Sequence, residues 1–308
     1  MGANEEKAID RSKRRDARVR EAVGLLEAGV SEILTSGRFK DYLRFLAALH
    51  RYSPNNSLLI FLQRPDATRV AGYKRWRELG RQVRRGEEGI RILAPILKKV
   101  PGDEMDERVS GSAAGASGRA PTQVLIGFKT VKVFALEQTD HVPGAPPLPT
   151  PPELGSVGSG PEAHVVAARL EAGLRSLLER EDVPVSEEEM EGRDGYYNRS
   201  EKRIALRAGL SEVERATTLC HEAVHHLLHE KGSAPTTRAT RETEAEGTSY
   251  AVFSYFGLDT GEFSFAYVAN FVADTEVLKT ALSRIRDVAH RIIETVEALP
   301  TSESGAAA

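Results

Sequence analysis

The residues most able to do chemistry lie together in the segment TTLCHEAVHHLLHE, residues 217–230. Within it, His221, Glu222 and His225 form an H-E-x-x-H pattern. Two histidines four positions apart lie one turn apart on a helix, so their imidazoles can bind one metal ion. The carboxylate between them points further round the helix and can act as the general base of a hydrolytic reaction. The pattern therefore predicts a Zn²⁺ site with a catalytic Glu222.

A helix must position these side chains, and the sequence predicts where it begins. Ser211 and Glu214 form an S-x-x-E capping box. The residues after them repeat apolar side chains at helical spacing, and the two histidines lie at the edge of that apolar face. Cys220 lies on the face itself, which favours a small buried residue over a ligand. The alternative interpretation of the segment is a histidine-rich helix that binds no metal.

A catalytic zinc ion needs a third protein ligand and an open position. His229 continues the row, but it lies about 12 Å from His221 along the helix axis, too far for one ion to bind both. The next predicted helix contains Glu242 and Glu246, one turn apart on one face. We expect Glu242 to bind the ion and Glu246 to accept the N–H of a ligating histidine, with the reversed order as the alternative.

Three neighbouring polar residues are not expected to bind the ion. Glu244 points away from the face that Glu242 and Glu246 share, which predicts a solvated side chain. His226 lies off the ligand face and His229 lies out of reach. We interpret both histidines as surface or packing residues.

The rest of the chain divides into two predicted domains. Residues 5–140 combine helical and β-type segments, which predicts a small mixed α/β domain with a flexible Gly/Ser-rich insertion at 101–120. Residues 141–161 are rich in Pro and Gly and predict a linker. Residues 162–298 predict a mainly helical domain with a short β-sheet. The predicted fold class is therefore α+β with two domains.

Composition limits the cellular setting. No stretch of the 308 residues approaches the roughly 20 apolar residues that cross a bilayer, so no membrane partner is expected. The N-terminus has no apolar core of a secretory signal. The chain has one cysteine, which excludes an intrachain disulfide and fits a reducing, cytoplasmic setting.

The charge is divided unevenly along the chain. Residues 1–100 hold 22 Lys and Arg against 12 Asp and Glu, whereas the remainder holds 20 against 33. A basic region of this kind can bind nucleic acid, although a solvated basic face is the plainer interpretation.

Aromatic and basic residues alternate in one segment of the basic region. Single strands are bound by cations along the phosphates and by aromatic faces under the bases, with little sequence preference. The pattern is typical of a nucleic-acid-binding surface, and Trp76 is also open to interpretation as a core residue. The candidate contacts are Tyr73, Lys74, Arg75, Trp76, Arg81, Arg84 and Arg85.

Two longer patterns resemble known families. RIALRAGLSEVERATTLCHEAVHHLLH, followed by E-x-E-A-E, resembles the ImmA/IrrE-type zinc metallopeptidases over roughly residues 162–298. YSPNNSLLIFLQRPDATRVAGYKRWRELGRQVRRGEEGIRILAPI, with VFALEQT after it, resembles the N-terminal single-stranded-DNA-binding domain of ArdC-type antirestriction proteins. The resemblance implies a minimal zincin fold and a gluzincin-like zinc metalloendopeptidase. Because a linker tethers this domain to the DNA-binding domain, the main hypothesis is an enzyme that cleaves protein targets at or near DNA. It does not imply which protein is the substrate.

Two other functions stay open from the sequence. The first is a DNA-protecting antirestriction protein whose zinc is structural. The second is a regulatory protease that cleaves a transcriptional repressor and uses the basic domain for docking to protein, which predicts no salt-dependent DNA binding.

Overall fold

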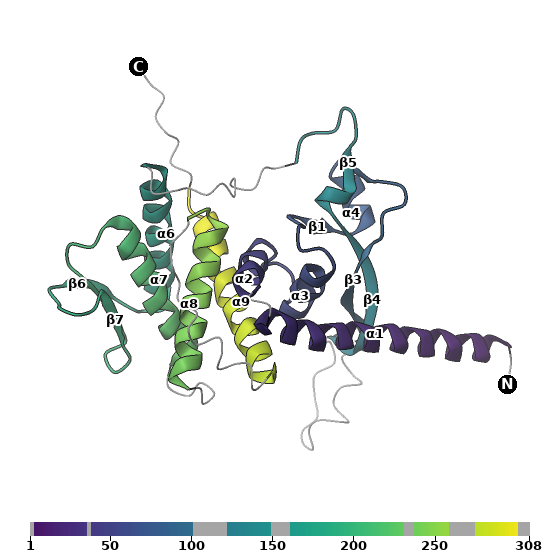
Figure 1. The fold of residues 1–308 in the computed structure, drawn as a ribbon, viewed down its shortest axis with the longest axis horizontal. Helices are drawn as coiled ribbons and strands as arrows, with labels where there is room; N and C mark the ends of the chain where they lie inside the picture. Colours follow the sequence, from purple (N-terminus) through teal and green to yellow (C-terminus); the bar gives the residue numbers. More distant parts are fainter. Residues whose placement is uncertain are drawn as a thin grey trace, which may run out of the picture.

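The computed structural model is an α+β protein of two parts, which confirms the predicted fold class (Figure 1). It describes residues 3–35, 38–100, 122–148, 161–230, 237–258 and 275–300. The insertion predicted at 101–120 lies outside the described residues, as does most of the linker predicted at 141–161. Among the described residues, no helix is both long and apolar enough to cross a membrane.

The N-terminal part packs helices against a long β-ribbon. Strands β3 and β4 form this antiparallel ribbon, β1 pairs with the end of β4, and β2 pairs separately with β5. Helices α1 and α3 pack on the ribbon. The elements are α1 (Ala3–Thr35), α2 (Phe39–Ala48), α3 (Pro54–Gln63), β1 (Val70–Ala71), α4 (Tyr73–Glu78), β2 (Arg81–Val83), β3 (Ile90–Val100), β4 (Thr122–Ala135), η2 (Leu136–Gln138) and β5 (Thr139–His141).

Local sequence explains how α3 is attached to β3. Ser53 precedes Pro54 and accepts a hydrogen bond from the Asn56 backbone N–H, which caps the helix. The Asn56 side chain donates to the Leu93 carbonyl and accepts from the Leu93 N–H, both at 2.8 Å. One amide group thus replaces a strand neighbour along β3 and ties the helix to the ribbon.

The C-terminal part is mainly helical with one small sheet. The sheet has the order β6-β8-β7, with β7 antiparallel and β6 parallel to β8. This sheet agrees with the short β-sheet predicted for residues 162–298, although the residues of β6, VSEE, alternate no apolar side chains. The elements are α6 (Pro161–Arg180), β6 (Val185–Glu188), β7 (Gly195–Asn198), β8 (Arg203–Arg207), α7 (Glu212–His229), α8 (Arg238–Tyr255) and α9 (Thr275–Glu297).

Helices α8 and α9 also pack against the N-terminal part. Helix α2 lies on α8, and α9 contacts α1, α2 and α3 as well as α6, α7 and α8 (Figure 1). Tyr250 of α8 and Ile285 of α9 belong to the same apolar cluster as Leu43 of α2. Gly247 permits this approach, because a Cβ there would lie 3.0 Å from Ile285 and 3.6 Å from Leu43. The domain boundaries at 5–140 and 162–298 stay a prediction.

Candidate functional site

Helix α7 begins at the predicted capping box. Ser211 Oγ accepts a hydrogen bond from the Glu214 N–H at 3.3 Å, and the Glu214 carboxylate accepts one from the Ser211 N–H at 2.9 Å. These bonds satisfy backbone groups that a helix start leaves without partners. Cys220 is fully buried on the face that packs into the core, as predicted. The cap and the apolar face together fix the direction in which the histidines point.

Three side chains from α7 and α8 converge on one point. His221 Nε2 and His225 Nε2 lie 3.0 Å apart, and each lies 3.5 Å from Glu242 Oε2. The ligand atoms of a tetrahedral ion with bonds of about 2.0–2.1 Å lie roughly 3.3 Å from one another. The donor atoms are therefore spaced to hold one metal ion. The same three residues form a potential metal-binding group among the described residues.

One side of this group is open to solvent. The side chains of His221, His225 and Glu242 are 27%, 17% and 28% exposed. A structural zinc site is closed by four protein ligands, whereas a catalytic site leaves one position for water or substrate. Three donors with an accessible side match the second arrangement.

Glu222 is held beside the three donors by the sheet. Its Oε2 accepts a hydrogen bond of 2.8 Å from the Tyr197 backbone N–H. Tyr197 belongs to β7, an edge strand of the C-terminal sheet. Burial raises the pKa of Glu222, and the neighbouring His221 opposes that rise. A positioned carboxylate with a raised pKa is suited to take up a proton.

The protonation states of the donors also suit metal binding. Burial and the charge of His221 lower the pKa of His225 to about 4, so that its imidazole is neutral at pH 7. Burial also disfavours the charged form of His221, but the hydrogen bond with Glu242 and the charge of Glu222 raise its pKa overall. The hydrogen bond with His221 in turn lowers the pKa of Glu242. A metal ion must displace the His221 proton, which makes metal affinity depend on pH.

The other two glutamates of α8 do not have the environments predicted for them. Glu246 Oε2 is buried without a hydrogen-bond partner among the described residues, and burial raises the pKa of this carboxyl. The prediction that Glu244 is solvated is wrong, because its side chain is 1% exposed. Helix α9 covers that side of α8 and brings Arg284 Nε to 3.4 Å from Glu244 Oε1. Helical periodicity alone could not show that a third helix covers this face.

The two remaining histidines of α7 are both buried, each 3% exposed. His226 Nδ1 lies 3.0 Å from the Tyr197 hydroxyl. His229 Nδ1 lies 3.0 Å from His225 Nδ1, and its Nε2 lies 2.7 Å from Glu244 Oε2. This contact between His229 and His225, a predicted ligand, was not predicted from the sequence. The spacing of four between His225 and His229 was the signal that could have found it.

Trp76 is a core residue, so its prediction as a base-stacking contact is wrong for this structure. Its side chain is 1% exposed, and its indole Nε1 donates to the Phe134 carbonyl at 2.8 Å. A base can stack only on an exposed ring face. The alternative interpretation from the sequence, a core residue on an amphipathic helix, describes the environment of Trp76.

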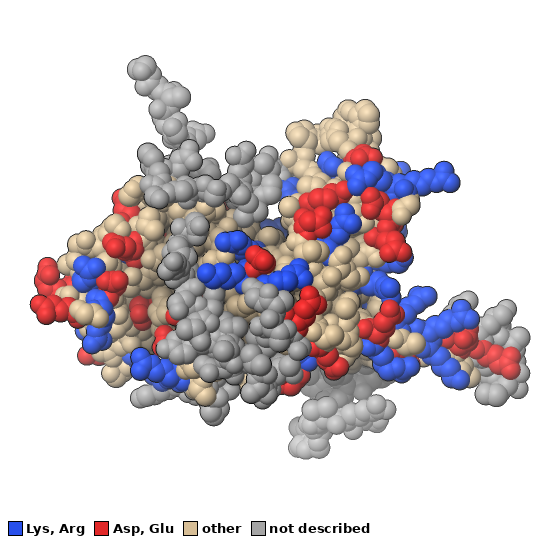
Figure 2. Space-filling model, in the orientation of Figure 1, with Lys and Arg blue, Asp and Glu red and all other residues tan. Residues whose placement is uncertain are grey.

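The other candidate DNA contacts differ in how freely they could bind. Lys74 and Arg85 are exposed and have no ion pair within the described ranges, and Tyr73 is 43% exposed. Three arginines have protein partners instead: Arg75 with Glu78 at 3.0 Å, Arg81 with the Thr139 hydroxyl at 2.7 Å, and Arg84 with Glu87 at 2.9 Å. Figure 2 shows basic side chains interleaved with acidic ones on this part of the visible face. The candidate surface is therefore a set of separate cations rather than a continuous basic patch.

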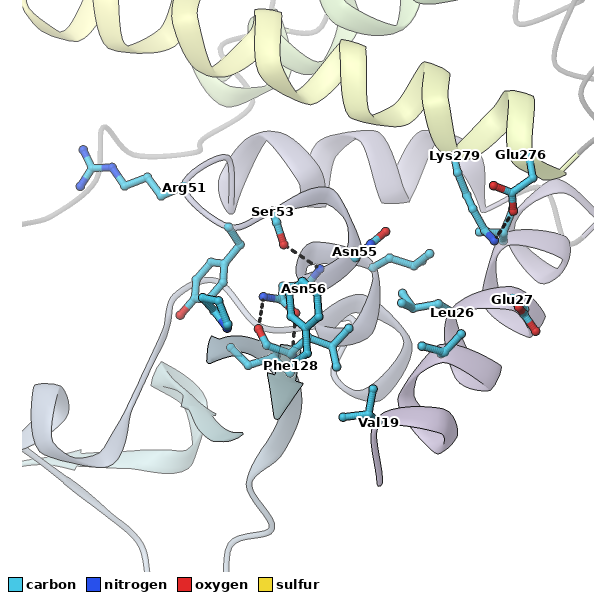
Figure 3. Close-up of a pocket in the computed structure, with 17 residues that line it drawn as sticks. Val19, Leu26, Glu27, Arg51, Ser53, Asn55, Asn56, Phe128, Glu276 and Lys279 are labelled. Carbon is cyan, nitrogen blue, oxygen red and sulfur yellow. Dashed lines mark hydrogen bonds and ion pairs between the residues drawn. The ribbon is translucent and has the colours of Figure 1, made fainter. Parts of the chain in front are cut away.

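A cavity of about 680 Å³ lies in the N-terminal part, between α1, α3, the β3–β4 ribbon and the start of α9 (Figure 3). Its walls are largely apolar and include Phe128, which is 46% exposed. Tyr52, Ser53 and Asn55, which are part of the ArdC-like pattern, also line it. Its volume is within the range of small-molecule sites, about 300–1,000 Å³.

Two family models match the chain in succession. Residues 20–134 match the N-terminal domain of anti-restriction factor ArdC, and residues 178–266 match the IrrE N-terminal-like domain of the Peptidase_M78 type. Both resemblances noted in the sequence are confirmed, with their order along the chain. The metal-binding group and Glu222 lie in the second matched region, and the candidate DNA contacts lie in the first.

Individual relatives are more distant. The uncharacterized protein pXO2-81 of Bacillus anthracis is 25% identical over 282 residues, which are 83% of this chain and 47% of that protein. The chain thus spans about half the length of this curated relative. Two crystal structures of the antirestriction ArdC protein from the R388 plasmid, metal-free and Mn(II)-bound, are 20% identical with a TM-score of 0.47. They cover 81% of this chain and, respectively, 87% and 86% of their own.

Proposed function

We propose that the chain is a cytoplasmic zinc-dependent endopeptidase that binds single-stranded DNA through its N-terminal part and cleaves protein targets at or near that DNA. Zinc is held by His221, His225 and Glu242, and Glu222 is the general base. The observation that carries the proposal is the convergence of three donor atoms at 3.0–3.5 Å beside a half-buried carboxylate that the Tyr197 N–H holds in place.

Each residue of the centre has a defined task in this proposal. An ion held by His221, His225 and Glu242 would supply Lewis-acid activation of the scissile carbonyl. Glu222 takes a proton from the attacking water and delivers it to the departing amine, which leaves the carboxylate unchanged after each turnover. The Tyr197 N–H holds Glu222 through Oε2 and leaves Oε1 for the proton transfer. The raised pKa of Glu222 makes it a stronger base than a solvated glutamate.

Zinc is proposed because of the donor set. Two imidazoles and one carboxylate, with a fourth position open, are the ligands of many catalytic zinc ions, whereas Mn²⁺ favours sites rich in oxygen donors. Titration of the metal-free protein with each ion separately tests this choice. We expect tighter binding of Zn²⁺, and preferential binding of Mn²⁺ would contradict it.

The proposed DNA contacts are Tyr73, Lys74 and Arg85. The two cations are exposed and free to neutralise phosphates, and the tyrosine ring is accessible to a base. Fluorescence anisotropy with a labelled single strand at two salt concentrations tests this part. We expect the affinity to fall as the salt concentration rises. Peptide hydrolysis without any salt-dependent DNA binding would instead favour a regulatory protease that cleaves a repressor.

The alternative of a structural zinc in a DNA-protecting protein is less well supported. A structural zinc does not explain why Glu222, a half-buried carboxylate with a raised pKa, is held next to the proposed ligands. It also does not account for the exposed side of the metal-binding group.

The substitution Glu222→Gln tests the catalytic proposal. Glutamine has the same shape and can still accept the Tyr197 N–H, but it cannot take up a proton. We expect the variant to bind zinc and to lose peptide hydrolysis about 10²–10⁴-fold. The matched control is Glu212→Gln on the same helix, whose side chain is 46% exposed and pairs with His164, and this variant should stay within tenfold of the unaltered protein. Hydrolysis retained in Glu222→Gln would refute the mechanism.

A further inference from the structure

A buried row of polar side chains lies behind the metal-binding group. It begins at His225 on α7, passes through His229 on the same helix and Glu244 on α8, and ends at Arg284 on α9. We propose that His229 and Glu244 are positioning residues that fix the tautomer and ring orientation of His225 for metal binding. This inference rests on the proposed metal site.

The contacts form an unbroken series. His225 Nδ1 lies 3.0 Å from His229 Nδ1, and His229 Nε2 lies 2.7 Å from Glu244 Oε2. The other carboxylate oxygen, Oε1, lies 3.4 Å from Arg284 Nε. Arg284 also donates to the Leu228 carbonyl at 2.5 Å, which holds the guanidinium against the end of α7. Three helices thus fix the row at both ends.

The acceptor at the end of the row determines where the protons lie. A carboxylate accepts hydrogen bonds, so His229 must carry a proton on the Nε2 that faces Glu244. With a single proton, on Nε2, His229 has its lone pair on Nδ1, and in that state His225 donates its own Nδ1–H to it. His225 Nε2 is left without a proton, and this is the atom that faces His221 Nε2 and Glu242 Oε2. The row therefore selects the tautomer of His225 that can bind a metal ion.

Burial leaves these groups few other partners. The side chains of His229 and Glu244 are each 1% exposed, so water does not compete for their hydrogen bonds. A buried carboxylate without a cation is strongly unfavourable, and Arg284 supplies the cation. An apolar pair would fill this space without the cost of desolvating a carboxylate and an imidazole. A role toward the metal ligand explains why polar side chains occupy it.

The experiment compares two buried histidines of one helix. His226 and His229 are each 3% exposed, but only His229 contacts a proposed ligand, and the nearest partners of His226 include the Tyr197 hydroxyl. The substitutions His229→Phe and His226→Phe therefore replace two equally buried side chains but remove different hydrogen bonds. His229→Gln is the conservative variant, because its amide can accept from His225 and donate to Glu244. Zn²⁺ affinity of each metal-free protein is measured by competition with a chromophoric chelator, with circular dichroism to verify folding.

We expect His229→Phe to weaken Zn²⁺ binding about 10–100-fold, His229→Gln to recover part of that loss, and His226→Phe to stay within about threefold of the unaltered protein. Unchanged affinity in His229→Phe would overturn the positioning role. Equal losses in both phenylalanine variants would overturn it too, because the effect would then be one of packing. An unaltered protein that binds no Zn²⁺ would overturn the metal site itself, and the positioning role with it.

A second measurement needs no variant. Long-range nitrogen–proton correlation spectra of the ¹⁵N-histidine-labelled, Zn²⁺-loaded full chain report the tautomer of each imidazole. We expect His225 to be protonated at Nδ1 and His229 at Nε2. A proton on His229 Nδ1 alone would contradict the proposed series even if every variant failed to fold.

Discussion

Substitution of Trp76 tests whether this residue stabilises the core of the N-terminal part or contacts DNA. The substitution Trp76→Leu removes the indole hydrogen bond to the Phe134 carbonyl, worth about 0.5–1.5 kcal/mol. Leucine is smaller by roughly 60 Å³, and at about 24 cal/mol per Å³ of cavity the loss of packing adds about 1.5 kcal/mol. Because the side chain is 1% exposed, the full sum of about 2–3 kcal/mol should appear in the free energy of unfolding.

The assay pairs stability with DNA affinity. Trp76 is the single tryptophan, so urea unfolding is followed by circular dichroism rather than by fluorescence. The matched control is Tyr73→Leu on the same helix, which should change stability by less than about 0.5 kcal/mol. If a base stacks on Tyr73, this control should weaken single-strand binding by about 1–3 kcal/mol, whereas folded Trp76→Leu should bind as the unaltered protein does. A stable Trp76→Leu protein with tenfold weaker DNA binding would refute the assignment of Trp76 to the core.

Three further predictions concern charge, pH and the helix start. Replacing Lys74 and Arg85 together with glutamine should lower the slope of log affinity against log salt by about 1.4 for a single strand, and an unchanged slope excludes this surface. Burial lowers the pKa of His50, so below about pH 6.5 the unfolded chain binds a proton that the folded chain does not. The free energy of unfolding should therefore decrease as the pH decreases below about 6.5. The substitution His50→Phe should remove up to about 1.4 kcal/mol per pH unit of that slope, and an identical slope in both proteins contradicts this assignment. Ser211→Ala should cost about 1 kcal/mol in chemical unfolding, and no loss would show that the capping box contributes nothing.

The convergence of the candidate site residues could be predicted because its signals are local. The capping box fixes the start of α7, and a spacing of four fixes the common direction of His221 and His225. Predicting Glu242 as the third ligand required a further step, because it lies on a different helix. Its spacing of four from Glu246 limited the candidate ligands to one face of that helix. The structure brings Glu242 to 3.5 Å from both histidines.

The parts that sequence could not predict depend on contacts between distant segments. Glu244 is buried because α9 crosses α8 and provides Arg284, 40 residues further along the chain. Strand β6 exists because β8 offers it a parallel partner, although its own residues do not alternate. Trp76 is buried against β4, 58 residues further along the chain, where the Phe134 carbonyl accepts its indole N–H. In each case, contacts between distant segments, rather than local periodicity, decide the environment.

The central claim is that His221, His225 and Glu242 hold one zinc ion, and elemental analysis of Zn²⁺-reconstituted, extensively dialysed protein tests it most directly. We predict one zinc per chain in the unaltered protein and in Glu222→Gln, and less than a tenth of that in a His221→Ala/His225→Ala double variant that remains folded. Absence of zinc from the unaltered protein, or a full equivalent retained by the folded double variant, would contradict the account.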